Sequence, residues 1–148
     1  GFEVAKAPGR HPQRTACGKL YLAAGDHGTY ATFFENGRDA YLRITYKGPD
    51  TLGQDVAMPS AGFEDLCVAW EAECECGPQW CARFYLDPLG DQKMESFPDI
   101  GKLRPQEARS VVAIDFLGVG AINRAITRGG SVRKLAAEFR GVVRALLS

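Results

Sequence analysis

Five cysteines are the first residues of this chain whose type and spacing could carry chemistry. They are Cys17, Cys67, Cys74, Cys76 and Cys81. The last three surround a Gly-Pro turn, which could bring the final cysteine back beside either of the other two. An odd number of cysteines in this pattern predicts one or two disulfides with one thiol left over. Buried thiols or a zinc site are the alternatives, but only His11 and His27 could complete a zinc site, so we expect no metal centre.

Acidic side chains near a turn offer a second kind of site. Asp50 could bind calcium together with Asp55, because Ca²⁺ takes carboxylate oxygens as ligands. Tyr46 could stack on a sugar ring beside them. The simpler interpretation is that Gly-Pro-Asp-Thr forms a turn in which the aspartate bonds its own backbone. We therefore expect no resident cofactor, and calcium is the one ion that these residues could hold.

Catalytic motifs are absent from the sequence. It contains no Gly-x-Ser-x-Gly, no His-Glu-x-x-His, no phosphate loop and no dinucleotide fingerprint. Cys67 or Cys81 could act as a nucleophile with His27 as its base, but nothing around these residues supports such a pair. We expect that the protein is not an enzyme.

Composition and charge exclude several classes of partner. The chain has 148 residues, of which 45% are hydrophobic and 24% charged, and its net charge is +0. From residue 101 onward there are nine Lys and Arg against three acidic residues, so the last third carries +6 and the first hundred residues −6. The basic residues have no aromatic or glycine-rich recognition surface around them, so we expect no nucleic-acid binding. No run reaches the roughly 20 apolar residues that cross a bilayer, so we expect no transmembrane span.

The elements that would position these residues fall into three regions. Residues 1–16 hold prolines, glycines and basic side chains without periodicity, which is typical of an extended arm. Residues 17–91 form a β-rich region. Within it, Asn36-Gly37 predicts a hairpin that pairs strands 29–35 and 40–47 antiparallel.

Further strands are expected in the same region at residues 19–23, 54–58 and 79–86. In the last of these, Trp80, Ala82, Phe84 and Leu86 should point inward. Between them, a stripe of apolar residues from Phe63 to Cys74 has helical spacing, although a strand is also possible there.

The third region, residues 92–148, predicts a helical hairpin. Pro105 suits a first helical position, and the helix after it is apolar on nearly all sides, with Ile114, Leu117 and Ile122 on its main stripe. A second helix follows Gly129-Gly130. Its basic face is formed by Arg133, Lys134, Arg140 and Arg144. Such a face is usually solvated, but it could also contact an acidic partner or an anionic membrane surface.

The predicted fold class is therefore α+β, a small antiparallel β-sandwich or sheet followed by a C-terminal helical hairpin. The apolar stripe and the basic face are the expected interaction surfaces. We expect the isolated chain to expose Ile114, Leu117 and Ile122 and to self-associate. The chain begins at Gly1 instead of Met, which is typical of a processed protein or a fragment. With the disulfides, this favours an extracytoplasmic location, either secreted, at the cell surface or in an organelle lumen, where the chain could lie peripheral to a membrane complex.

One segment carries a resemblance to a known family. Leu22-Ala-Ala-Gly-Asp-His27, then Thr32-Phe-Phe-Glu-Asn-Gly37, then 40–46 and Gly48-Pro-Asp-Thr51 resemble the closing strands of the protective-antigen domain family, a lectin-like β-sandwich. The match covers about thirty residues within 19–58. In that family, calcium and sugar are held by an acidic pair in an earlier loop. No such pair occurs in residues 1–18, so no sugar-binding residue is transferred to this chain.

Two functions follow from these observations. The first is a non-catalytic structural or accessory subunit that docks with other protein subunits in a larger complex, through its arm and its C-terminal helices. The alternative is a calcium-dependent carbohydrate-binding module, similar to adhesins and lectins, that binds a glycan near Tyr46, Asp50 and Asp55. The missing acidic pair favours the first function.

Overall fold

The computed structural model describes residues 1–10, 12–36, 41–61, 78–117 and 134–146. Strands take 42% of the described residues and helical turns 6%, and no helix among them reaches seven residues. The strands are β1 Gly25–Glu35, β2 Tyr41–Arg43, β3 Thr45–Tyr46, β4 Val56–Ala57, β5 Trp80–Leu86, β6 Glu107–Val111, β7 Asp115–Leu117 and β8 Leu135–Ala145. The helical turns are η1 Pro49–Thr51 and η2 Ile100–Lys102. The predicted α+β class is therefore wrong for this part of the chain, which is a β structure.

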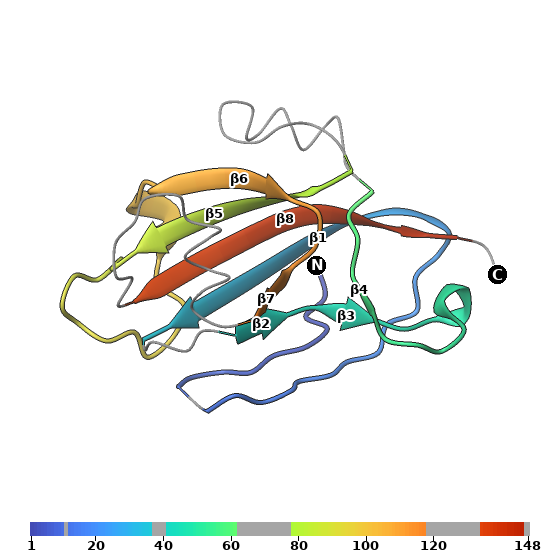
Figure 1. The fold of residues 1–148 in the computed structure, drawn as a ribbon, viewed down its shortest axis with the longest axis horizontal. Coiled ribbons are helices and arrows are strands. Elements are labelled where there is room, and N and C mark those ends of the chain that lie inside the picture. The colour runs from blue at the N-terminus through green and yellow to red at the C-terminus, as the bar shows by residue number, and fades with distance from the viewer. Residues whose placement is uncertain (11, 37–40, 62–77, 118–133, 147–148) are drawn as a thin grey trace.

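A four-stranded antiparallel sheet forms the main layer (Figure 1). Its strand order is β1-β8-β5-β6, so β8, the last strand in the sequence, lies in the middle of the sheet. The register places Ala137 of β8 between Phe33 of β1 and Phe84 of β5. The centre of the sheet is therefore built from segments that are far apart in the sequence.

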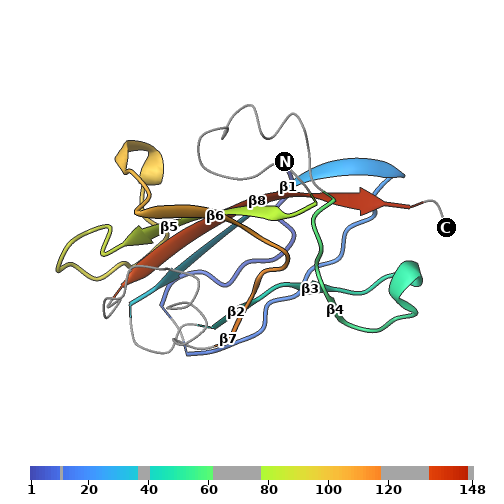
Figure 2. The same ribbon diagram turned by 45° about the horizontal axis from the view of Figure 1, so that its top comes forward.

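A smaller second layer lies against one face of this sheet (Figure 2). In it β2 pairs with β7, and β3 pairs with β4. Ile44 joins the two pairs, because its backbone N–H donates to the carbonyl of Ile114 and its carbonyl accepts from the N–H of Met58. The chain then returns to the main sheet, where Ser60 Oγ accepts a hydrogen bond of 3.0 Å from the N–H of Val142. These bonds hold the two layers together.

The hydrophobic core fills the space between the two layers. Three phenylalanines from different strands, Phe84, Phe116 and Phe139, meet there with ring centroids 5.8 to 6.1 Å apart. Trp80 is fully buried and donates a hydrogen bond of 3.0 Å from Nε1 to the carbonyl oxygen of Met58, so its polar atom is satisfied. Gly141 lies against this indole ring, and a Cβ placed there would come within 2.4 Å of the Trp80 ring. A residue without a side chain is therefore required at that point of β8.

The predicted C-terminal helical hairpin is wrong in its described part. The stretch that was expected to form the second helix is β8, and the chain after Pro105 forms β6 and β7. Because β8 is a central strand covered on both faces, its residues from Leu135 to Phe139 are all buried and do not alternate between apolar and polar. A run of this kind cannot be told from a buried helix by periodicity alone, which explains the error.

The predicted hairpin at Asn36-Gly37 is also wrong, because β1 pairs with β8 and β2 pairs with β7. The chain passes from the main sheet to the second layer between β1 and β2. Residues 19–23 form no strand. By contrast, β5 is confirmed close to its expected bounds, β1 covers the expected 29–35 but begins earlier at Gly25, and β4 lies within the expected 54–58. The stripe from Phe63 to Cys74 lies outside the described residues.

Residues 1–10 and 12–24 run outside both layers. In residues 1–10 and 12–24 there is no regular secondary structure. Figure 1 shows this segment in blue, extending away from the sheets and returning to the start of β1. We call residues 1–10 and 12–24 the N-terminal ribbon. Its two halves touch where Gly18 meets the backbone of Val4, so closely that a Cβ at Gly18 would overlap the Val4 carbonyl.

Candidate functional site

A buried carboxylate lies at the centre of the outer face of the main sheet, the face turned away from the second layer. Glu138 of β8 is only 3% exposed. In the register of the sheet it lies beside Thr32 of β1 and Arg83 of β5. A buried charge is costly unless it is paired and hydrogen-bonded, so the neighbours of Glu138 decide what it can do.

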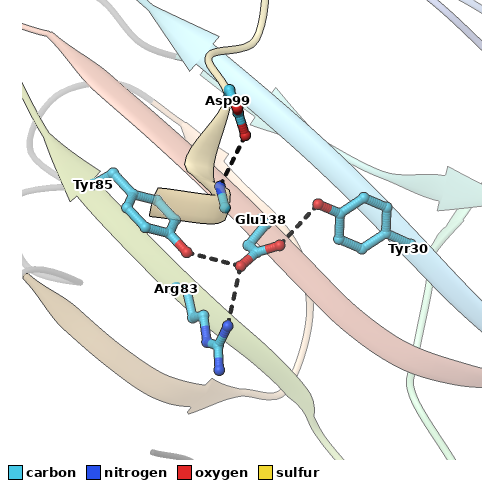
Figure 3. Close-up of polar contacts among 6 residues, drawn as sticks. Tyr30, Arg83, Tyr85, Asp99 and Glu138 are labelled. Carbon is cyan, nitrogen blue, oxygen red and sulfur yellow. Dashed lines mark hydrogen bonds and ion pairs between the residues drawn. The ribbon is translucent and has the colours of Figure 1, made fainter. Parts of the chain in front are cut away.

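Three side chains donate to this carboxylate (Figure 3). The hydroxyl of Tyr30 lies 2.8 Å from Oε2, and the hydroxyl of Tyr85 lies 2.9 Å from Oε1. The Arg83 guanidinium approaches Oε1 at 3.5 Å and supplies the opposite charge. Both oxygens of Glu138 are therefore occupied, and the cluster ties β1, β8 and β5 together across the sheet.

The cluster changes the acidity of both tyrosines. Burial raises the pKa of Tyr85 to about 12, and the hydrogen bond to Glu138 acts in the same direction. The pKa of Tyr30 is raised as well, first by burial and then by the same carboxylate. The two hydroxyls therefore remain protonated donors at neutral pH.

A shallow groove lies next to this cluster. Its lining consists of Gly28, Thr29 and Tyr30 of β1 with Arg140 and Gly141 of β8. Tyr30 is 52% exposed, and the Arg140 guanidinium lies 5.5 Å from the centre of its ring, which is a cation–π geometry. The groove has an aromatic wall and a floor of backbone at the two glycines, and it is open to solvent.

A connecting segment covers the other end of the outer face. Met94 is fully buried there and packs with Tyr85 and Ala136. The side chain of Asn36 holds this segment in place, because its amide donates to the carbonyl of Met94 at 2.6 Å and accepts from the N–H of Met94 at 2.7 Å. One end of the face is therefore closed, and the end near the groove is open.

The predicted calcium and sugar residues are brought together in part. The Tyr46 hydroxyl donates to Asp50 Oδ2 at 2.8 Å, and this bond raises the pKa of Tyr46. Asp55 is exposed between η1 and β4. Within the described ranges, no three His, Cys, Asp or Glu side chains form a group that could hold a metal ion. The Tyr46–Asp50 contact alone supplies few of the six to eight oxygens that calcium takes.

Two of the five cysteines lie in the described residues, one in the N-terminal ribbon and one in β5. Cys17 is a free, exposed thiol in the N-terminal ribbon, and Cys81 lies in β5. The two described cysteines are not bonded to each other, because Cys17 is free whereas Cys81 takes part in a disulfide. The predicted pairings that involve Cys67, Cys74 and Cys76 lie outside the described residues.

The residues of the expected apolar interaction surface have other roles or are not described. Ile114 is fully buried in the core, so the expected exposed stripe is wrong at this residue, and the self-association expected through the stripe stays a prediction. Leu117 pairs with Tyr41 through the backbone of β7. Ile122 lies outside the described residues.

The described residues of the expected basic face form no common surface and make separate contacts. The Lys134 ammonium donates to the carbonyl of Gly90 at 2.6 Å, and Arg140 lies over Tyr30. Arg144 forms a two-pronged pair with Asp26, with distances of 2.6 and 2.9 Å, which lowers the pKa of Asp26 and raises that of Arg144. Arg133 lies outside the described residues. No basic helix exists in the described range 134–146.

The described chain contains no helix long and apolar enough to pass through a bilayer.

The N-terminal ribbon presents the most exposed aromatic side chains of the described structure. Phe2 is 88% exposed and Tyr21 85%. Val4, Leu20 and Leu22 of the same ribbon are between 40% and 46% exposed. The sequence indicated an arm at residues 1–16 but not that residues 20–22 join it, because their composition is that of a strand.

The Glu138 cluster was not found from the sequence. Its members come from strands separated by 53 and 108 positions, so no local motif could connect them. One signal was present: a lone glutamate inside the otherwise apolar run from Leu135 to Phe139 indicates a buried charge that must have partners.

Comparisons of the chain with family models, with curated proteins and with solved structures give no match. The relation to the protective-antigen domain family, which depends on thirty residues, therefore stays a prediction.

Proposed function

We propose that this chain is a non-catalytic accessory subunit of a larger assembly and that the N-terminal ribbon attaches it there. The observation that carries this proposal is the exposure of Phe2 and Tyr21 to 88% and 85%. Exposed aromatic side chains on a segment that adds nothing to the core are typical of a contact surface. In an assembly these side chains are covered.

A non-catalytic role is supported by the state of Glu138, the one buried carboxylate among the described residues. Both oxygens of Glu138 accept hydrogen bonds from side chains of the same sheet. A general base must lie within reach of a substrate proton, and Glu138 is only 3% exposed. We therefore assign the cluster a structural role, in which it stiffens the sheet.

The test uses the full chain, tagged at its C-terminus and expressed in the cells that produce it. A gentle extract is fractionated by size, and the mass at which the chain elutes is compared with its own 16.1 kDa. We expect the wild-type chain to elute at a much larger mass. The double variant Phe2→Ser with Tyr21→Ser should shift toward the mass of the single chain.

Leu52→Ser is the matched control, because Leu52 is 90% exposed but lies outside the ribbon, after η1. We expect this variant to elute with the wild type. Elution of the wild-type chain as a monomer would refute the proposal, and so would an equal shift of the control variant.

Calcium-dependent carbohydrate binding is the second candidate, and the observation in its favour is the exposed Tyr46–Asp50 contact. A melting experiment separates the two functions. If the chain is an accessory subunit, calcium leaves the melting temperature unchanged. A rise with calcium that Asp50→Asn abolishes would favour the carbohydrate-binding function.

A further inference from the structure

The N-terminal ribbon combines its exposed apolar side chains with a local excess of positive charge. Its basic side chains are Lys6, Arg10, Arg14 and Lys19, and its one acidic side chain is Glu3. The ribbon thus carries a net charge of +3 within a chain whose overall charge is zero. Basic and aromatic residues together are the composition of segments that lie in the interface of an anionic membrane.

The basic side chains of the ribbon are weakly engaged in the structure. Lys6 lies 3.0 Å from Glu3, and Arg10 lies 3.4 Å from Glu95 outside the ribbon. The side chains of these two ion pairs are between 47% and 74% exposed. Exposed ion pairs are weak and easily screened by salt. These cations can therefore exchange their carboxylate partners for other anions at little cost.

Charge and apolar groups also lie next to one another. The Lys19 ammonium is 5.1 Å from the centre of the Tyr21 ring, which is the exposed aromatic side chain of the same half of the ribbon. Gly18, which precedes Lys19, contacts the backbone of Val4 in the other half. Val4 follows Phe2 by two positions in the sequence. A basic and an aromatic side chain thus lie side by side, within three positions of the point where the two halves touch.

From this combination we propose that the surface which the ribbon meets is an anionic lipid bilayer. Phe2 and Tyr21 enter the interfacial region, and the basic side chains contact lipid phosphates. This inference rests on the proposed function and names the partner of the same surface. It replaces the basic helix as the expected membrane contact.

A bilayer fits the ribbon better than a protein groove does. A protein pocket needs side chains held at matched positions, whereas the described ribbon has no strand or helix to fix Phe2 relative to Tyr21. A lipid interface has no fixed shape and accepts aromatic side chains from an irregular segment. Its negative surface potential adds an attraction for each Lys or Arg.

The test is co-sedimentation of the full chain with vesicles. One set contains phosphatidylcholine alone, and the other contains phosphatidylcholine mixed with phosphatidylserine, at low and at high salt. We expect binding to the mixed vesicles that falls as salt rises. Phe2→Ser with Tyr21→Ser should abolish it. Arg14→Gln with Lys19→Gln should weaken it on the order of tenfold or more, since each basic residue near an anionic surface contributes about a fivefold factor.

Lys93→Gln with Lys102→Gln is the matched charge control, because it removes two exposed lysines that lie outside the ribbon. Its binding should stay close to that of the wild type. A loss equal to that of the ribbon variant would overturn the inference, because it would show attraction to net charge alone. Failure to bind the mixed vesicles, or equal binding to both vesicle types, would also overturn it.

Failure of the inference can be told from failure of the proposed function. If the chain binds no vesicles but still elutes at a large mass after detergent has removed lipid, its partner is a protein, and only the inference fails. If it binds no vesicles and elutes as a monomer, both fail.

Discussion

The core between the two layers and the N-terminal ribbon both contain large apolar side chains, but the core buries them and the ribbon exposes them to solvent. Trp80, Phe84 and Phe139 are at most 1% exposed, whereas Phe2 and Tyr21 are more than four-fifths exposed. Burial of an aromatic side chain contributes a few kcal/mol to stability, so the core determines whether the chain folds. The exposed aromatic side chains of the ribbon do not make this contribution to stability.

This difference indicates which residues can be changed without loss of the fold. The core is closed by contacts that leave no room for extra atoms, and the outer face of the main sheet is held by a fully satisfied polar cluster. The ribbon contacts the rest of the chain through the exposed Arg10–Glu95 pair, among others. Substitutions in the two regions should therefore separate stability from attachment.

The largest expected effect is in the core, for Gly141→Ala. The new Cβ would lie 2.4 Å from the buried Trp80 ring, so the ring or the strand must shift. We expect a loss of about 3 kcal/mol in the free energy of unfolding, measured by urea denaturation, since overpacking a core costs about 1–3 kcal/mol. Gly28→Ala in the neighbouring strand is the control, because a Cβ at Gly28 meets open space. Equal losses in the two variants would disprove the tight contact.

Glu138→Gln should have the next largest effect. The change leaves the Arg83 charge without its carboxylate and weakens two hydrogen bonds to tyrosine, so we expect a loss of about 2 kcal/mol in unfolding free energy. Glu95→Gln breaks only an exposed pair with Arg10 and should cost less than about 0.5 kcal/mol. If both variants unfold at the same urea concentration, the cluster is not a stabilising element.

Alkaline pH should weaken the sheet through the same cluster. Because the pKa of Tyr85 in the folded chain is raised to about 12, above the value near 10 of an unfolded tyrosine, folding favours the protonated form. Its contribution is complete below about pH 10 and is lost as pH rises toward about 12. Unfolding curves across this range should show a decline that is smaller in Tyr85→Phe. The same decline in that variant would contradict the assignment.

The smallest effect on stability is expected in the ribbon. Phe2→Ser with Tyr21→Ser removes two side chains that are already in solvent, so the free energy of unfolding should change by less than about 0.5 kcal/mol. Thermal and urea unfolding of the purified chain would measure this. A loss comparable to that of Gly141→Ala would mean that the ribbon belongs to the core.

Strands with clear alternation could be predicted from the sequence. Trp80, Ala82 and Phe84 alternate with Cys81 and Arg83, and β5 was found with its inward face. Strand β1 was found from its aromatic and β-branched residues, and Phe33 and Phe34 point to opposite faces and pack in different clusters. Local pattern is sufficient where one face of a strand differs from the other.

Pairing and central strands could not be predicted in the same way. Asn36-Gly37 is a strong local hairpin signal, but the pairing of β1 with β8 depends on contacts more than a hundred positions apart in sequence. Strand β8 is buried on both faces, so it lacks the alternation that identifies a strand. The Glu138 cluster depends on this same pairing, so it could not be predicted from the sequence for the same reason.

Hydrogen exchange read by mass spectrometry tests the central claim most directly, with the full chain free and then bound in its assembly or on mixed vesicles. We predict that amides of the N-terminal ribbon exchange rapidly in the free chain and slowly in the bound one, while those of β8 are protected in both. Unchanged exchange in the ribbon, with new protection at the groove between Gly28 and Arg140, would contradict the account.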